Sequence, residues 1–256
     1  MDTIIFFMNR LSEISTKAPK EFDKKETKEK TDKLLEELDE LQNLLYAESK
    51  YAVLVILQGL DASGKDGAIN KVFGQLNPQG VEVQSFKVPT ELELKHDFLW
   101  RIHQHAPEKG MMQIFNRSQY EDVLVTRVHG WCDDATAEKR FDAINNFEEL
   151  LTLHNSTVIF KFYLHISPEE QQGRFKERLD DPSKQWKYNE KDFEEAKLWD
   201  KYMQVYEDAF ENCNAVPWTI VPADQNWYKE YVIAKTVVDA LKDLNMSYPQ
   251  LKKADQ

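Results

Sequence analysis

The feature that most constrains the fold is a buried strand that runs directly into a glycine-rich loop. Residues 51–58 read YAVLVILQ, a continuous run of apolar and β-branched side chains. Such a run is typical of a strand that is covered on both faces of a parallel sheet. The next residues, GLDASGKDG, complete the pattern G-x-x-x-x-G-K at Gly59, Gly64 and Lys65, and a helical pattern follows. A strand, this loop and a helix in that order predict a phosphate-binding loop, whereas a glycine turn that only joins strand to helix is the alternative.

The chemistry expected of this loop comes from its backbone and from one lysine. Backbone N–H groups and the N-terminus of the helix surround phosphates, and Lys65 neutralises a terminal oxygen. The phosphate-binding positions predicted here are Gly59, Ala62, Ser63, Gly64, Asp66 and Gly67.

Two carboxylates in this loop are unusual for a phosphate site. Asp61 lies inside it, and Asp66 stands where a Ser or Thr hydroxyl normally holds Mg²⁺. Asp66 is interpreted either as an indirect partner of a metal or as an acid that is favourable at a helix N-terminus.

Strand patterns alternate with helical patterns along the rest of the chain. The further strands are predicted at 81–88, 110–116, 157–166 and 218–223. Helices are predicted at about 68–76, 91–106, 118–128, 134–153 and 227–244. This alternation predicts an α/β fold in which helices flank both faces of a parallel sheet.

Two helical segments lie outside the simple alternation. Leucines recur at spacings of three and four over 34–45, which predicts an apolar helix stripe packed on its own domain or on a second subunit. A charged and aromatic segment at about 168–213 contains two helical patterns hinged near 180–188 and resembles a lid. We therefore expect an N-terminal helical extension (1–50), a main domain with its lid (51–245) and a C-terminal tail (246–256).

Composition limits the partners of this chain. The net charge of −12 argues against nucleic-acid binding, so a polyanionic ligand would have to meet a local basic channel. No apolar run approaches the roughly 20 residues that span a bilayer. The start, MDTIIFFMNRL, carries an early acid and no small-residue cleavage site, so we do not interpret it as a signal peptide. Cys132 and Cys213 have no metal-binding spacing and are expected to be reduced, buried thiols of a cytoplasmic protein without membrane contacts.

Polar residues at the end of the strand predicted at 110–116 are candidates for the site. Asn116 and Arg117 fall at its carboxyl end, where ligands bind in open α/β sheets. Asn116 occupies a position where many phosphate-loop enzymes use a metal-binding Asp, and it is a weaker metal partner. Arg117 is suited to bidentate phosphate binding, and a surface arginine paired with Glu121 is the alternative.

Cations of the lid and of other strand ends are further candidates. Arg174 and Arg178 are four residues apart and share one helix face, from which they could close over phosphoryl groups. A solvated, charged helix is the alternative. The remaining candidates for an anion channel are Lys184 and Lys187 near Trp186, together with Lys87, Arg101 and Arg127, each of which could instead be an ion-pair partner.

At this point several segments match a known family. The segments GLDASGKDGA, SFKVPT, FNRSQYEDVLVTRVHGW, RFKERLDDPSKQWKY, LWDKYMQVYEDA and VPADQNWY resemble the polyphosphate kinase 2 family, in the family's order, from about residue 51 to about 241. The resemblance implies a P-loop kinase-like (thymidylate-kinase-like) sheet with a helical lid. It also implies reversible, Mg²⁺-dependent transfer of phosphoryl groups from inorganic polyphosphate to nucleotides, with Mn²⁺ as a substitute metal.

Roles for single residues follow from the same resemblance. Asp61 would act on the acceptor phosphate and on metal, Lys65 and Arg117 would bind phosphates, and Arg178 would act from the lid. Asn116 with Glu121 five residues on resembles the subgroup that phosphorylates both AMP and ADP, although some members carry Asp at position 116. The predicted nucleotide-binding set is Arg101, Asn116 and Glu121. The base, adenine or guanine, stays open, and a homodimer or homotetramer is implied.

This activity would explain acids in a phosphate loop. The attacking group would be a nucleotide phosphate that is already ionised near pH 7, so no general base is necessary. The site must instead offset the repulsion between two polyanions, with cations and with a metal held by a carboxylate such as Asp61. The alternatives are an ATP-dependent nucleotide kinase on the same fold and a non-catalytic nucleotide-binding module.

Overall fold

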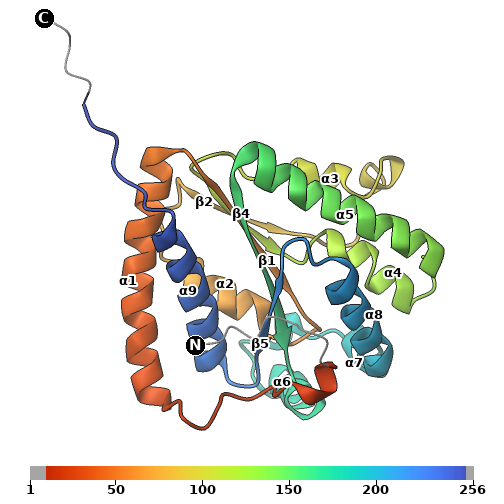
Figure 1. Ribbon diagram of the computed structural model, residues 1–256. Helices are drawn as coiled ribbons and strands as arrows, with labels where there is room; N and C mark the ends of the chain where they lie inside the picture. Colours follow the sequence, from red (N-terminus) through yellow and green to blue (C-terminus); the bar gives the residue numbers. More distant parts are fainter. Residues whose placement is uncertain (1–9, 252–256) are drawn as a thin grey trace, which may run out of the picture.

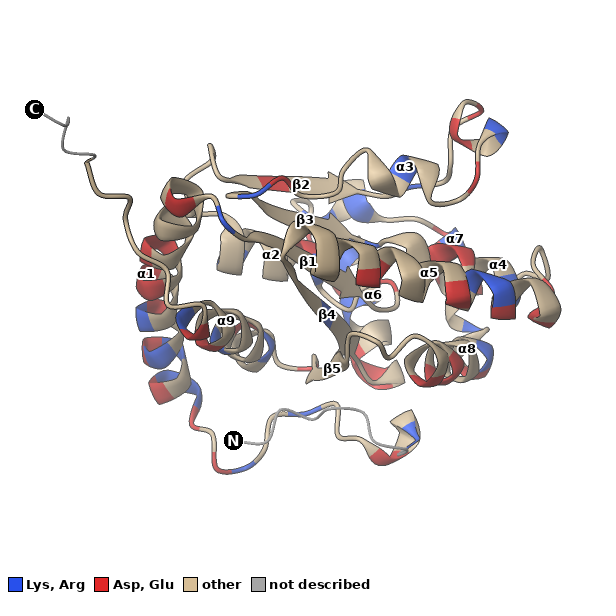
Figure 2. Cartoon of the chain, turned by 45° about the horizontal axis from the view of Figure 1, so that its top comes forward, with Lys and Arg blue, Asp and Glu red and all other residues tan. Residues whose placement is uncertain are grey.

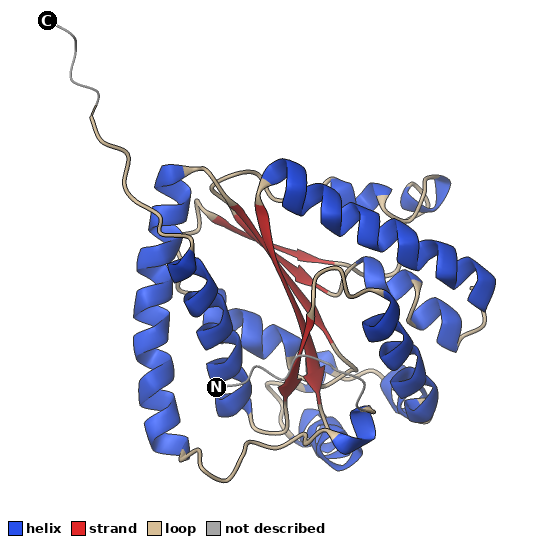
Figure 3. Cartoon of the chain, in the orientation of Figure 1, coloured by secondary structure: helices blue, strands red, loops and turns tan. Residues whose placement is uncertain are grey.

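The computed structural model describes residues 10–251, and its centre is a five-stranded sheet (Figure 3). The strands are β1 (Ala52–Gln58), β2 (Val81–Ser85), β3 (Met112–Asn116), β4 (Thr157–His165) and β5 (Trp218–Pro222). Their order is β2-β3-β1-β4-β5, and every neighbouring pair is parallel. The predicted α/β class and its parallel sheet are therefore confirmed. Strand β2 ends three residues before the predicted boundary.

The central strand explains why the sheet is covered on both sides. All seven residues of β1 are buried. Leu54 and Ile56 belong to one apolar cluster, whereas Val53, Val55 and Leu57 belong to a second cluster on the opposite face. Successive side chains of a strand point to opposite faces, so a continuous apolar run requires a helical layer on each.

Those two layers come from different parts of the chain (Figure 1). One contains α1 (Lys24–Glu48), α2 (Lys65–Phe73) and α9 (Asn226–Asp243). The other contains α4 (Val125–Val128), α5 (Asp134–Asn155) and α8 (Trp199–Asn212), with the short η1 (Leu11–Glu13) beside them.

Helix α1 contains the leucine stripe. Asp23 caps its first turn by accepting hydrogen bonds from the backbone N–H groups of Lys25 and Glu26. Leu38 and Leu45 are buried in the same cluster as residues of α9, so the stripe packs on its own chain. The apolar start of the sequence falls mainly on residues 1–9, outside the described residues, and the last five residues of the predicted tail also lie outside them.

Two predicted helices are broken in the structure. The segment 91–106 forms η2 (Glu93–Lys95) and α3 (Trp100–His103), because His96 is extended and Asp97 starts a new turn by accepting a hydrogen bond from Leu99 N at 3.0 Å.

The segment 118–128 forms η3 (Gln119–Asp122) and then α4. Ser118 starts η3 by accepting a hydrogen bond from Tyr120 N, and Val123 ends it with non-helical dihedral angles.

The lid segment begins with α6 (Pro168–Asp180), capped by Ser167, and continues through η4 (Gln185–Lys187) and α7 (Lys191–Ala196) into α8. Helix α6 ends where the hinge near 180–188 is predicted. Both cysteines are free and buried. Within residues 10–251, each helix is too short or too polar to span a bilayer.

Candidate functional site

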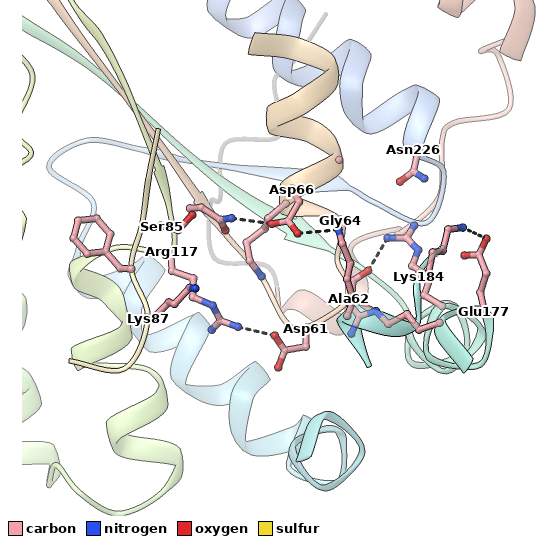
Figure 4. A pocket seen from close by; sticks show the side chains of 17 residues that line it. Asp61, Ala62, Gly64, Asp66, Ser85, Lys87, Arg117, Glu177, Lys184 and Asn226 are labelled. Carbon is pink, nitrogen blue, oxygen red and sulfur yellow. Dashed lines mark hydrogen bonds and ion pairs between the residues drawn. The ribbon is translucent and has the colours of Figure 1, made fainter. Parts of the chain in front are cut away.

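The pocket that contains the phosphate loop lies at the carboxyl edge of the sheet. The glycine loop follows β1 directly, and the register of β1 with β3 places Leu57 opposite Asn116. The two strand ends therefore deliver the phosphate loop and Arg117 to adjacent positions. The cavity measures about 540 Å³. Its lining, shown in Figure 4, is Asp61, Ala62, Gly64, Lys65, Asp66, Gly67, Ser85, Phe86, Lys87, Asn116, Arg117, Arg174, Glu177, Arg178, Lys184, Lys187 and Asn226.

The pocket is basic although the chain is acidic. Seven lysines and arginines line it, against three carboxylates. The whole chain has a net charge of −12, and Figure 2 shows acidic residues along the outer helices α1, α5 and α8. A cleft concentrates the electrostatic field of the charges that line it. The positive charges of this pocket therefore favour anions, although the chain as a whole is negative.

Lys65 makes direct hydrogen bonds to the loop backbone. It is the first residue of α2 and is buried, and its Nζ donates to Gly59 O at 2.7 Å and to Leu60 O at 3.1 Å. Burial, reinforced by the positive charge of Arg117, lowers the pKa of Lys65 to about 8.

Arg117 connects the end of β3 to the phosphate loop. Its φ of 64° lies in the left-handed region, which is strained for a residue with a side chain. Its Nη2 donates to Asp61 Oδ1 at 2.6 Å, and its Nη1 donates to Glu121 Oε2 at 2.9 Å. The negative charge of Glu121 raises the pKa of Arg117 against the effect of burial, and Asp61 adds to it. Arg117 is thus paired with Glu121, as the alternative interpretation of this arginine predicts, but it also lines the pocket.

Asp66 forms an ion pair with the lid. Its Oδ1 accepts from Asn116 Nδ2 at 2.9 Å, and its Oδ2 accepts from Lys187 Nζ at 3.1 Å. Partial burial would raise the pKa of Asp66, but these two hydrogen bonds lower it below the ordinary value. The acid at the usual Ser or Thr position therefore ties together α2, β3 and the lid.

The two lid arginines have different partners although they share a helix face. Arg178 Nη1 donates to Asp192 Oδ2 at 2.8 Å. Arg174 turns to the loop, where its Nη1 donates to Ala62 O at 2.8 Å. Lys184 pairs with Glu177 at the outer rim.

A second, narrow pocket of about 20 Å³ lies under the lid. It is lined by Gly59, Leu60, Asp61, Arg117, Glu121, Val125, Gln171, Asp192, Glu195, Ala196, Trp199, Tyr202 and Tyr206. Asp61 and Arg117 line both pockets, so the two cavities meet at this ion pair.

Three predicted ligand positions lie outside both pockets. Arg101 is buried, and its Nη1 donates to Lys87 O at 2.9 Å, so it supports the loop that carries Lys87. Arg127 Nη2 donates to Asp134 at 2.7 Å and to Asp208 at 2.9 Å, on the side of α4 and α8. Ion pairing was the alternative that the sequence left open for Arg127, and it is the arrangement the structure has, with one partner seven residues away and the other 81 residues away. Ser63, the third, is buried beneath the loop surface.

Sequence reasoning missed several residues that contact the loop. Gln171 Nε2 donates to Asp61 O at 3.0 Å, and Lys229 Nζ donates to Gly64 O at 3.0 Å. Neither belongs to a recognisable motif, because each reaches the loop only through the packing of α6 or α9. Ser85 and Phe86 also line the pocket, and they were missed because they fall inside the strand predicted at 81–88, whereas β2 ends at Ser85.

The carboxylates of the pocket fit a hard divalent cation. Within residues 10–251, no cluster of three or more His, Cys, Asp or Glu residues forms a complete metal cage. Mg²⁺ at phosphate sites needs only one or two protein carboxylates, because phosphate oxygens and water supply the rest. Asp61 and Asp66 both line the pocket next to the loop and meet that requirement.

Comparison with known proteins gives consistent matches over most of the chain. The family model described as Polyphosphate kinase 2 (PPK2) matches residues 21–249. An AMP/ADP-polyphosphate phosphotransferase of Meiothermus ruber is 48% identical over 221 residues, which are 86% of this chain and 82% of that protein. An ADP-polyphosphate phosphotransferase of Rhodopseudomonas palustris is 42% identical over 86% of this chain and 81% of that protein. The crystal structure of Polyphosphate Kinase 2 from Arthrobacter aurescens TC1 superposes with a TM-score of 0.94 at 40% identity, covering 98% of this chain and 91% of that one.

Anion binding should depend on the protonation of Lys65. A lysine is charged below its pKa, so binding of tripolyphosphate without metal should weaken as the pH rises through about 8. Tripolyphosphate itself gains negative charge over this range, which would change the affinity in the opposite direction if the lysine stayed protonated. Titration calorimetry at constant ionic strength measures the profile, and Lys65→Met should bind more weakly and show a flatter profile. A wild-type affinity that rises steadily with pH would contradict this assignment.

Proposed function

Because the chain belongs to the polyphosphate kinase 2 family, we propose that it catalyses the Mg²⁺-dependent, reversible transfer of a phosphoryl group from inorganic polyphosphate to AMP and ADP. The observation that carries the proposal is the strongly cationic pocket built on the phosphate loop of an otherwise acidic chain. A chain of phosphates is a ligand whose charge matches that cavity.

The end of the polyphosphate lies over the loop in this proposal. Loop N–H groups, the N-terminus of α2 and Lys65 bind its terminal phosphates, and the lid cations bind the units behind them. The candidate ligands for that chain are Lys87, Arg178, Lys184 and Lys187. Arg174 is less available for it, because its guanidinium donates to the carbonyl of Ala62 in the loop and to those of Ala223 and Asp224 after β5.

Transfer takes place where the two pockets meet, at Asp61 and Arg117. An oxygen of the nucleotide phosphate attacks the terminal phosphorus, and the bond from that phosphorus to the bridging oxygen breaks. The nucleotide gains one phosphoryl group, and the polyphosphate leaves one unit shorter with its charge held by Lys65. Since the attacking oxygen is already ionised, the site has to position the groups and stabilise charge rather than remove a proton.

Asp61 would hold the metal, with Asp66 as the second available carboxylate. Mg²⁺, or Mn²⁺ in its place, would supply positive charge that offsets the repulsion of the phosphate groups. In the structure, Asp61 is paired with Arg117. Phosphate competes for Arg117, so substrate binding frees the carboxylate as it engages the guanidinium.

The lid excludes water during transfer. Water competes with the nucleotide for the terminal phosphoryl group, so an open site would hydrolyse polyphosphate. The ion pair of Lys187 with Asp66 connects η4 to the loop. The ion pair of Arg178 with Asp192 connects α6 to α7. These contacts support a closing role for the lid.

We assign the choice of acceptor to Asn116 and Glu121, beside the transfer point. The relative from Meiothermus ruber is named for both AMP and ADP, and that from Rhodopseudomonas palustris for ADP. We propose that this chain accepts both. We further propose that it acts in the cytoplasm as a homodimer or homotetramer, for which light scattering of the purified protein gives the subunit number.

The donor distinguishes this function from an ATP-dependent kinase. With ADP as acceptor, long-chain polyphosphate and Mg²⁺ should yield ATP, which luciferase detects, because the cation-lined pocket is built for a phosphate chain. The control is the same mixture with another nucleoside triphosphate as donor. ATP formation from the triphosphate alone would refute the proposal, and tight nucleotide binding without turnover from either donor would indicate a binding module.

The variant Asp61→Asn tests whether Asp61 binds the metal. We expect kcat to fall on the order of a hundredfold, because the metal loses its carboxylate ligand. Mn²⁺ binding in the presence of tripolyphosphate, followed by electron paramagnetic resonance, should weaken in parallel. Glu177→Gln is the control, because it removes a charge from the rim of the same pocket. An unchanged Mn²⁺ affinity in Asp61→Asn would remove Asp61 from the metal site.

Glu121→Ala should change the ratio of the two acceptors. Loss of its pair with Arg117 frees that guanidinium beside the acceptor position. The kcat/KM ratio for AMP against ADP should shift several-fold, about 1 kcal/mol of discrimination. Glu149→Ala on the exposed face of α5 is the control. An equal loss with both acceptors would mean that Glu121 supports Arg117 without selecting the acceptor.

A further inference from the structure

Side chains of two distant helices hold the carbonyl groups of the phosphate loop. From α6, Gln171 binds Asp61 O and Arg174 binds Ala62 O, at 3.0 and 2.8 Å. A carbonyl that accepts a hydrogen bond from behind the loop cannot point its negative end at a bound anion. These contacts therefore favour a loop that presents its N–H groups to phosphate.

Lys229 of α9 makes the third contact of this kind. Its side chain is fully buried, and it does not line the pocket. Its Nζ donates to Gly64 O at 3.0 Å and to Asn226 Oδ1 at 2.8 Å. Gly64 O also accepts the hydrogen bond from Ala68 N that closes the first turn of α2. Lys229 thus fixes the residue from which the phosphate-facing end of α2 begins.

The ammonium group of Lys229 lies against the backbone of Gly64, at the position that a side chain would occupy. Gly64 has φ +93°, and a Cβ at this position would lie 2.3 Å from Lys229 Nζ and 3.2 Å from Arg174 Nη1. Such contacts are far shorter than van der Waals separation. The second glycine of the motif is therefore required by its backbone conformation, and a side chain there would also displace the Lys229 ammonium.

The charge of Lys229 is costly where it lies. Its two hydrogen-bond partners are neutral oxygens, and burial followed by repulsion from Arg174 lowers its pKa to about 8. The carboxylates of Glu230 and Glu170 offset this loss only in part, since the pKa of Lys229 stays below its ordinary value. An anion bound on the phosphate side of the loop would add a further counter-charge.

We propose that Lys229 is a positioning residue for the phosphate chain: it holds the Gly64 carbonyl away from the pocket and places a positive charge directly behind the loop. The proposal rests on polyphosphate being the ligand of this pocket, as proposed above. Lys229 acts through Gly64 and Asn226 and does not touch substrate.

Lys229→Met tests this role while nearly keeping the buried volume. Isothermal titration with tripolyphosphate, without metal at pH 7, should give a Kd raised about tenfold, because a charge-assisted hydrogen bond and a nearby cation are lost. KM for polyphosphate should rise in parallel, whereas KM for ADP should change less than about threefold. Lys235→Met is the matched control, because it removes the same charge from the same helix at a partly exposed position, where the lysine pairs with Asp239. The control should keep the wild-type Kd.

The contrary result is equally definite. If Lys229→Met lowers the melting temperature but keeps the wild-type Kd and KM for polyphosphate, Lys229 only fills the space between α9 and α2, and the proposal is overturned. Should circular dichroism show that this variant is unfolded, Lys229→Gln replaces it, with the same weaker binding expected and an unchanged Kd again decisive against the proposal. Failure of the wild-type protein to bind tripolyphosphate would refute the proposed function itself, which separates the two outcomes.

Discussion

The arrangement of this structure depends on one interaction, the repulsion among the cations at one edge of the sheet. Seven lysines and arginines line a single pocket, and a cluster of that kind is unfavourable without counter-charges. The structure supplies those charges from the site itself. Arg117 pairs with Asp61 and Glu121, and other acids pair with the lid cations.

The acids in the phosphate loop are explained by the same constraint. Asp66 takes the place of a hydroxyl residue and pairs with Lys187 of the lid, so the loop and the lid are joined by charge. Asp61 neutralises Arg117 at the meeting point of the two pockets. A polyanion that enters the pocket competes with these carboxylates for the same cations. In the proposed mechanism the carboxylates would then be available to a metal, which a loop without acids would not offer.

The backbone of the loop depends on parts of the fold that carry no phosphate motif. Gln171 and Arg174 reach it from the lid helix, and Lys229 reaches it from the C-terminal helix. Helix α6 therefore joins the lid segment directly to the backbone of the loop. Arg174 illustrates the consequence, because a residue on the same helix face as Arg178 has become part of the loop's support.

Local sequence patterns were sufficient to predict the elements that depend on glycine geometry or on a continuous apolar run. The buried run at 51–58, the glycine spacing after it and the alternation of strands with helices determined the parallel sheet and the place of the loop, because apolar periodicity and glycine geometry act over a few residues. The motif spacing likewise brought Asp61, Lys65 and Arg117 to one edge. Tertiary packing alone decided that Arg101 and Arg127 turn away to other partners, that Asp66 meets Lys187, and that Lys229 lies beneath Gly64. A charged side chain takes the partner that the folded chain places within a few ångströms, and for residues separated by 165 positions no sequence spacing contains that information.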